Sequence, residues 1–203
     1  YHFQRQRRTV AAGSTPLIAP LVDYSFVGKP VRGGGYFTAD ASALALYRED
    51  GSDQTRLSTK LGWHVPYISP RGGMYTLRAT MRGDGYYVRD VVDPVTGANF
   101  TGFEGRAIPQ LSVEWRYPLV SSGATLTQQL EPIIQGVISP TGQNPNTIPN
   151  EDSRDFEFDD TNLFSEQRFS GYDRVEGGAR VNYGLRWSAY GNSGKSLDVM
   201  VGQ

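Results

Sequence analysis

Alternation of apolar and polar residues, repeated along most of the chain, constrains the fold more than any other feature. In residues 55–67 the odd positions hold Thr, Leu, Trp, Val and Tyr, whereas the even positions hold Arg, Ser, Lys, Gly, His and Pro. Successive side chains of a β-strand point to opposite faces, so this segment would have one apolar face and one polar face. Similar alternation runs through residues 17–27, 36–47, 74–82, 109–119, 125–138, 179–189 and 196–201. We therefore predict an all-β chain with about eight strands.

The predicted strands are long and carry aromatic residues near their ends. Several start about 19 residues apart, whereas a sandwich strand with its turn takes ~8–12 residues. Their length suits the ~9–11 residues with which a tilted strand crosses a bilayer. Trp63, Tyr67, Trp115 and Tyr117 lie near the ends of two apolar faces, as in the aromatic girdles of outer-membrane barrels. The pattern favours part of a large antiparallel transmembrane β-barrel of the outer membrane over the alternative, a soluble β-sandwich.

The expected connections between strands differ in length. Short polar turns that contain Gly or Pro lie at residues 49–53, 69–73, 121–123 and 191–195. Two connections are expected to be long, at about residues 83–106 and 139–178. Short turns at one end and long loops at the other are typical of outer-membrane barrels. Proline lacks an N–H, so strand ends, bulges or gaps in the pairing are expected at Pro20, Pro66 and Pro118.

Composition removes several functional classes. Twenty basic and 21 acidic residues give a net charge of -1, so the chain lacks the uniform positive field of a nucleic-acid binder and no nucleic-acid partner is expected. No apolar run approaches the ~18 residues of a membrane-spanning helix. The absence of cysteine excludes disulfides and thiolate metal sites within the chain. The sequence starts without Met and ends within a predicted strand, so we expect a fragment of a longer polypeptide whose remaining strands complete the sheet.

The polar faces of the strands are expected to line the lumen of the barrel. A cation on the lipid-facing side costs ~2–4 kcal/mol at mid-membrane, so charged positions should point inward. The candidate lumen-lining residues are Arg56, Lys60, His64, Arg78, Arg82, Glu114, Arg116, Arg180 and Arg186. This mostly basic set would either attract anions, including phosphorylated lipids, or simply solvate the lumen. The residues themselves leave both interpretations open.

Neither catalysis nor metal binding is predicted. His2 and His64 are the two histidines, and a hydrolase would need a histidine paired with a nucleophile and an orienting group. An acidic cluster, which comprises Glu151, Asp152, Asp155, Glu157, Asp159 and Asp160, could supply oxygen ligands for Ca²⁺. Its spacing does not fit an EF-hand, and a solvated loop is the favoured interpretation. We expect no enzyme activity, no metal and no cofactor.

One long segment is specific enough to carry a resemblance. Three stretches of the chain resemble the LptD family of LPS-assembly proteins, also called organic solvent tolerance proteins. They are IPNEDSRDFEFDDTNLF at residues 148–164, RFSGYDRV at 168–175 and VNYGLR at 181–186. PLIAPLVDY at residues 16–24 is similar to a strand of the same family. The resemblance covers nearly the whole chain and looks closest to alphaproteobacterial members. The motif residues that we single out in the loop are Asp155, Phe156, Phe158, Asp159, Asn162, Leu163, Phe164, Arg168, Phe169, Gly171, Asp173 and Arg174.

The resemblance implies a lipopolysaccharide (LPS) transport function in the outer membrane of a Gram-negative bacterium. Members of the family combine a periplasmic jelly-roll with a very large C-terminal barrel that an LptE-type lipoprotein plugs. LPS would arrive along a bridge of periplasmic Lpt proteins and leave sideways, between the first and last strands, into the outer leaflet. Residues 1–203 would then be a portion of that barrel, without the jelly-roll and the closing strand, and the loop at 149–175 would lie inside or over the barrel mouth. The alternatives are an outer-membrane porin or substrate-specific channel, a barrel lipase and a carbohydrate-binding β-sandwich.

Overall fold

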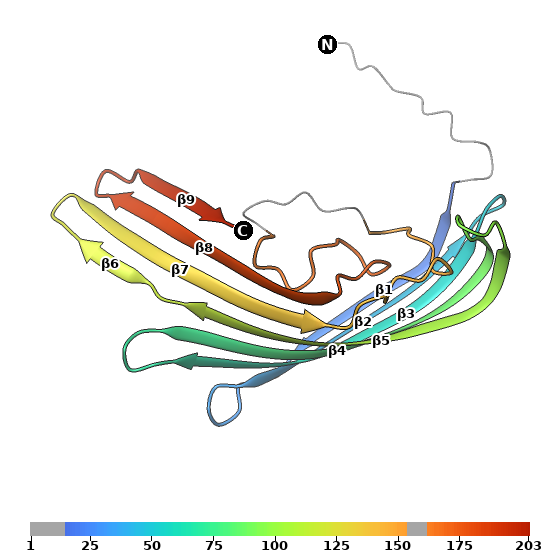
Figure 1. Cartoon of the computed structure of the whole chain (residues 1–203), viewed down its shortest axis with the longest axis horizontal. Helices are drawn as coiled ribbons and strands as arrows, with labels where there is room; N and C mark the ends of the chain where they lie inside the picture. Colours follow the sequence, from blue (N-terminus) through green and yellow to red (C-terminus); the bar gives the residue numbers. More distant parts are fainter. Residues whose placement is uncertain (1–14, 154–161) are drawn as a thin grey trace, which may run out of the picture.

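The computed structural model describes residues 15–153 and 162–203, which contain one antiparallel sheet of nine strands. Neighbours in the sheet follow the order β1-β2-β3-β4-β5-β7-β8-β9, and the short β6 pairs with β7. The sheet curves into an open trough (Figure 1). The strands are Leu17–Val27 (β1), Tyr36–Tyr47 (β2), Asp53–Ile68 (β3), Met74–Val92 (β4), Asn99–Arg116 (β5), Leu119–Ser122 (β6), Leu126–Ser139 (β7), Gly178–Gly191 (β8) and Ser196–Gly202 (β9). The all-β antiparallel fold predicted from the sequence is confirmed.

Prolines accompany irregular pairing at two of the three expected positions. The register between β1 and β2 shifts between Ile18 and Leu21, which flank Pro20. Pro118 lies in the break between β5 and β6. Pro66, by contrast, remains in regular register with β4, so that proline does not interrupt the pairing.

The prediction of a long connection over residues 83–106 is wrong, because most of these residues belong to strands. β4 extends to Val92 and β5 starts at Asn99, which leaves residues 93–98 as a short turn. The other predicted long connection is present between β7 and β8, where it covers residues 140–177.

The reason for the error is a local change in which side chains face outward. Gly83 and Gly85 take outward positions of β4, whereas Tyr86 and Val88 are fully buried at positions that face inward. Because glycine replaces the apolar outward residues, the alternation by which the other strands were recognised is lost here. The strand itself continues, since its ladder with β5 runs through these positions.

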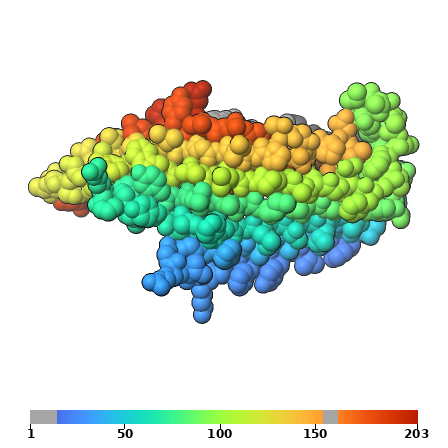
Figure 2. All heavy atoms as spheres, turned by 60° about the horizontal axis from the view of Figure 1, so that its bottom comes forward, coloured from blue at the N-terminus to red at the C-terminus, as the bar shows by residue number. Residues whose placement is uncertain are grey.

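The two faces of the sheet differ in polarity. Large apolar side chains on the convex face are exposed, and Leu61 and Val181 are 61% and 67% exposed. Figure 2 shows this face, across which the strands follow one another in chain order. In the part of the chain that the structure describes, no second sheet covers it. The rows of Trp and Leu therefore do not meet across two stacked sheets, as the β-sandwich alternative would require.

The connection between β7 and β8, which we call the inner loop (residues 140–177, of which 140–153 and 162–177 are described), folds back over the concave face (Figure 1). It reaches the turn between β2 and β3, where Arg48 Nη1 donates to Glu151 Oε1 at 2.9 Å. Ile148 of the inner loop completes a small apolar core whose other members are Tyr86, Val88, Val91 and, partly buried, Phe100. No helix within the described residues is long and apolar enough to cross a membrane.

Candidate functional site

Three arginines on adjacent strands, which we call the arginine cluster, form the centre of the concave face. Arg56 lies on β3, Arg82 on β4 and Arg106 on β5. Arg56 and Arg106 are buried, at 2% and 8% exposure. Buried guanidinium groups require partners because an unpaired buried charge is strongly destabilising. The partners come from β4 and from the inner loop.

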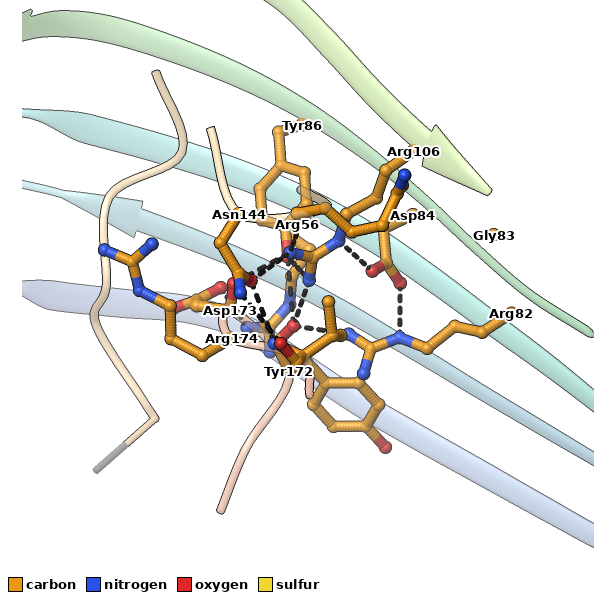
Figure 3. A network of polar contacts seen from close by, with 12 residues as sticks. Arg56, Arg82, Gly83, Asp84, Tyr86, Arg106, Asn144, Tyr172, Asp173 and Arg174 are labelled. Carbon is orange, nitrogen blue, oxygen red and sulfur yellow. Dashed lines mark hydrogen bonds and ion pairs between the residues drawn. The ribbon is translucent and has the colours of Figure 1, made fainter. Parts of the chain in front are cut away.

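Asp84 bridges two members of the arginine cluster (Figure 3). Arg82 Nε donates to Asp84 Oδ1 at 2.9 Å, and Arg106 Nε donates to Asp84 Oδ2 at 2.6 Å. One carboxylate thus orients two guanidinium groups through their Nε atoms. Their terminal nitrogens remain available to the inner loop.

Tyr172 of the inner loop contacts all three arginines. Its carbonyl oxygen accepts hydrogen bonds from Arg82 and Arg106, and from the Tyr86 hydroxyl at 3.2 Å. Its ring contacts two guanidinium groups, with the ring centre 4.8 Å from Arg56 and 5.2 Å from Arg82. Cation–π contacts of this kind are stronger when water is excluded. Tyr172 therefore anchors the loop to three strands at once.

Asp173 and Asp152 join two segments of the inner loop to Arg56. Asp173 is fully buried, and its Oδ1 accepts from Gln54 Nε2 at 3.0 Å and from Arg56 Nη1 at 2.7 Å. Its Oδ2 accepts from the backbone N–H groups of Glu151 and Asp152, at 2.8 and 3.1 Å. Arg56 Nη1 also donates to Asp152 Oδ2 at 2.6 Å. Four donors thus satisfy one buried carboxylate, which a neutral side chain could not replace.

The two carboxyl groups experience opposite shifts. Burial and the neighbouring charge of Asp152 raise the pKa of Asp173. Burial also acts to raise the pKa of Asp152, but the charge and hydrogen bonds of Arg56 hold it below its usual range. Asp152 is thus the more firmly ionised member of the pair, mainly because it lies next to Arg56.

Gly171 allows the loop backbone to approach Asp152. Its φ is +75°, in the left-handed region, and a Cβ at this position would lie 2.5 Å from Asp152 Oδ1. The Asp152 Oδ1 atom accepts from the backbone N–H groups of Tyr172 and Asp173, both at 3.0 Å. Glycine is therefore required by both the backbone conformation and the available space.

A second set of contacts holds the inner loop to β5, β7 and β8. Gln110 Nε2 donates to the carbonyl oxygen of Glu166 at 3.0 Å, and Ser112 Oγ donates to Glu166 Oε1 at 2.6 Å. Arg180 Nη2 donates to the same carbonyl oxygen at 2.5 Å, and Gln135 Nε2 donates to the carbonyl oxygen of Phe164 at 2.8 Å. The inner loop is therefore attached along both halves of its described length.

All nine candidate lumen-lining residues lie on the concave face, since their positions in the ladders place them on one side. Arg56, Arg82 and Arg180 contact the inner loop. The ion pairs among the others join Arg78 to Glu114 and Glu166, Arg116 to Glu114 and Glu131, and Arg186 to Asp198. His64 stacks on Tyr36 with ring centres 4.9 Å apart and lies 3.3 Å from Thr38 Oγ1, and Lys60 lines a cavity described below. That this face lines a lumen stays a prediction.

The motif residues differ in where the structure places them and in the contacts they form. Asp155, Phe156, Phe158 and Asp159 lie outside the described residues. Gly171 and Asp173 belong to the contacts with the arginine cluster, and Leu163 is buried. Phe164 is held through its carbonyl oxygen, Arg168 pairs with Glu176, and Arg174 donates its backbone N–H to Ser153 Oγ. The remaining two, Asn162 and Phe169, also lie in the described part of the loop.

Several residues of the site were not singled out in the sequence, among them Gln54 and Tyr86. Asp84 and Arg106 fell in the segment predicted as a connection, although Asp84 stands two residues after Arg82, the spacing of one face of a strand. Tyr172 stood inside the motif without being singled out. Asn144, whose side chain donates to and accepts from the backbone of Val175 at 2.7 and 2.9 Å, had no sequence signal.

The acidic cluster does not form a metal site where it is described. Glu151 and Asp152 pair with Arg48 and Arg56, and residues 155–160 of the cluster lie outside the described part of the chain. Over residues 15–153 and 162–203, no group of three or more acidic or histidine side chains is arranged to hold a metal ion.

Comparison with known proteins gives the same family as the motif. The family model of LptD, described as LPS transport system D, matches residues 1–203. The LPS-assembly protein LptD of Vibrio cholerae is 31% identical over 153 residues, which are 73% of this chain and 19% of that protein. The chain therefore spans about a fifth of the length of this relative. With a family match over its whole length, the chain belongs to the LptD family, whose members reside in the Gram-negative outer membrane.

Proposed function

We propose that this chain forms part of the wall of an outer-membrane β-barrel that delivers LPS to the outer leaflet, and that the inner loop narrows the lumen from within. One observation supports the proposal most directly. Within the described residues, the sheet leaves its apolar face uncovered, whereas its charged face is covered by a loop of the same chain that three arginines, two of them buried, hold in place.

The two faces suit the two parts of the substrate. LPS has a charged saccharide head and several acyl tails, so its transport requires a polar path beside an apolar one. A barrel wall with charged residues inside and apolar residues outside supplies both. The LptD family consists of transport barrels rather than enzymes, and the contacts of the arginine cluster are structural rather than catalytic.

The lengths of the connections suggest an orientation. The turns at residues 28–35, 69–73, 123–125 and 192–195 lie at one end of the sheet. The inner loop lies at the other end, together with the short turns at residues 48–52 and 93–98. Outer-membrane barrels have short periplasmic turns and longer extracellular loops. In this orientation the inner loop enters from the extracellular side and folds down onto the arginine cluster.

We also propose two kinds of protein partner, an LptE-type lipoprotein plug and a bridge of periplasmic Lpt proteins. The described residues of the inner loop cover only part of the concave face (Figure 1). Towards the short turns, Arg116 keeps a third of its side chain exposed, and the side chain of Arg186 is 47% exposed. This charged, less covered region is where we place the contact with the plug. The periplasmic bridge would act through a jelly-roll domain of the complete protein.

The test is depletion and replacement of the complete protein in its native bacterium. Depletion should remove newly made LPS from the cell surface, and the complete protein should restore it and co-purify with a lipoprotein. Planar-bilayer recordings of the purified complex give the control for the alternative function. Large steady ion conductance without a lipoprotein partner, together with normal surface LPS after depletion, would indicate a porin or substrate-specific channel instead.

A further inference from the structure

A cavity of about 250 Å³ lies between the concave face and the inner loop, beside the arginine cluster. β3 and β4 provide Ser58, Lys60, Thr80 and Arg82, and Tyr172 of the inner loop also lines the cavity. Figure 3 shows Arg82 and Tyr172 at the edge of the arginine cluster. The contacts that fix the loop leave this space unfilled.

Two donors in the cavity have no hydrogen-bond or ion-pair partner among the described residues. The Ser58 side chain is 1% exposed, and its Oγ is buried without a hydrogen bond. The Lys60 ammonium group forms no ion pair with the described residues, although Asp40 lies directly opposite in the β2–β3 ladder. A buried polar atom without a partner costs ~1–3 kcal/mol, so a site that retains such atoms is suited to a bound polar group.

The acids near the cavity are occupied by other partners. Glu176 pairs with Arg168 and Arg180, and Asp40 accepts a hydrogen bond from the Ser25 hydroxyl at 2.7 Å. Apart from the Asp40 carboxylate, whose charge one hydroxyl does not neutralise, the groups left for a ligand are donors, with Lys60 as the charged one. Donors around one ammonium group favour a ligand with an anionic group and several hydroxyls.

The volume limits the size of the ligand. About 250 Å³ is below the ~300–1,000 Å³ of sites that enclose drug-sized molecules, yet it equals roughly eight water volumes at ~30 Å³ each. A single inorganic anion would leave most of the space empty, and a whole lipid would not fit. One sugar ring with a charged substituent matches both the volume and the donors.

We propose that this cavity binds one sugar unit that carries a phosphate or carboxylate, with Lys60 pairing with the charge and Ser58 donating to or accepting from a ring hydroxyl. The inference deepens the proposed function, on which it rests for the origin of the sugar, because the saccharide of LPS carries such units. A free sugar phosphate has the same chemistry, so the experiment includes both sources.

The experiment measures binding to the complete protein in detergent by saturation-transfer NMR and calorimetry. The probes are glucose 6-phosphate, glucose, inorganic phosphate and a phosphorylated oligosaccharide released from LPS. Glucose 6-phosphate and the oligosaccharide should bind, and Lys60→Met should weaken both by about tenfold or more, the loss expected for a charged hydrogen bond. Lys29→Met, which removes the same charge from the exposed β1–β2 turn, should bind as the wild type does. Ser58→Ala should also weaken binding, and it replaces Lys60→Met if that variant does not fold.

Several outcomes would overturn the cavity site. These are no binding of either sugar probe, equal binding of glucose or of inorganic phosphate alone, and equal losses in the Lys60 and Lys29 variants. Binding by glucose 6-phosphate but not by the oligosaccharide would overturn the assignment to LPS. The measurement does not depend on transport. A protein that restores surface LPS but binds no sugar contradicts the cavity proposal alone, and one that binds the sugar but never restores surface LPS contradicts the proposed function alone.

Discussion

At the scale of single residues, the inner loop depends on a few charged atoms that are buried on both sides of the contact. Asp173 receives four hydrogen bonds, two from β3 side chains and two from the loop backbone. Removing one partner of such a buried pair leaves the other charge without compensation, which is far more costly than losing an exposed pair. The position of the loop therefore depends on residues that are buried from solvent.

Asp173→Asn should lower the free energy of unfolding by roughly 3–5 kcal/mol, the range for a broken buried ion pair. The amide would direct N–H groups at donors that now face a carboxylate. Urea unfolding of the complete protein in micelles, followed by tryptophan fluorescence, measures the change. Asp198→Asn is the matched control, because Asp198 and its partner Arg186 are both exposed, and its unfolding curve should overlay that of the wild type. Equal effects of the two substitutions would show that the inner loop contributes nothing to stability.

Gly171→Ala should displace the inner loop. A non-glycine residue in the left-handed region costs ~1–2 kcal/mol, and the clash with Asp152 adds to this. Gly194→Ala isolates the backbone part, because Gly194 has a φ of +81° and no atom within 4 Å of its would-be Cβ. Hydrogen exchange should be faster in the inner loop of the Gly171 variant and unchanged there in the Gly194 variant. Unaltered exchange in both would mean that the loop tolerates a side chain at residue 171.

At the scale of elements, the inner loop acts as a strap over the strands from β3 to β8. It pairs with charged groups that would otherwise be buried or exposed without partners, and Ile148 completes the apolar core with Tyr86 and Val88. It links strands that lie far apart in the chain. We therefore expect the loop to contribute to assembly as well as to the shape of the lumen.

Replacing residues 149–175 with a short Gly-Ser linker should impair barrel assembly. The arginine cluster would lose its loop partners, and the buried carboxylate that bridges Arg82 and Arg106 would not balance three guanidinium groups. The readout is the heat-modifiable mobility of the folded protein on semi-native gels. A control replaces residues 94–98, the exposed part of the turn between β4 and β5, with a turn of the same length, which should assemble normally. Unchanged heat-modifiable mobility of the linker variant would refute the assembly role.

The strands were largely predictable from the sequence, and the site was only partly so. Alternation is a local signal, so β2 and β8 were located within a few residues. The C-terminal half of β4 was not predicted, because Gly83 and Gly85 stand where the other strands have apolar residues. The contacts of the site are nonlocal: Gln54 and Asp173 bond across 119 residues. Their pairing depends on the direction in which the inner loop folds, which no local pattern specifies. The motif could therefore mark the loop, but it could not identify Arg106 as its partner.

At the scale of the whole molecule, the described chain is an amphipathic wall whose two sides require different surroundings. Exposed Leu, Val, Trp and Tyr side chains cover the convex face from β1 to β9. Exposed apolar surface of this extent marks a contact with lipid or with another protein. The charged face, in contrast, is partly covered by the inner loop. The wall thus supplies part of its own cover on the inner side and depends on its environment on the outer side.

This asymmetry predicts that an introduced arginine will impair folding on the convex face and will be tolerated on the concave face. Leu61 lies in the middle of β3 on the convex face and is 61% exposed, so Leu61→Arg should place a charge in the lipid at a cost of ~2–4 kcal/mol. Gln129→Arg is the matched change on the concave face, where Gln129 already donates to Glu131 at 3.0 Å and an arginine would gain an ion pair. Folding of the complete protein into lipid vesicles should decrease for Leu61→Arg and persist for Gln129→Arg. If both variants folded equally well, the convex face would not be in contact with lipid, and the barrel assignment would lose its physical basis.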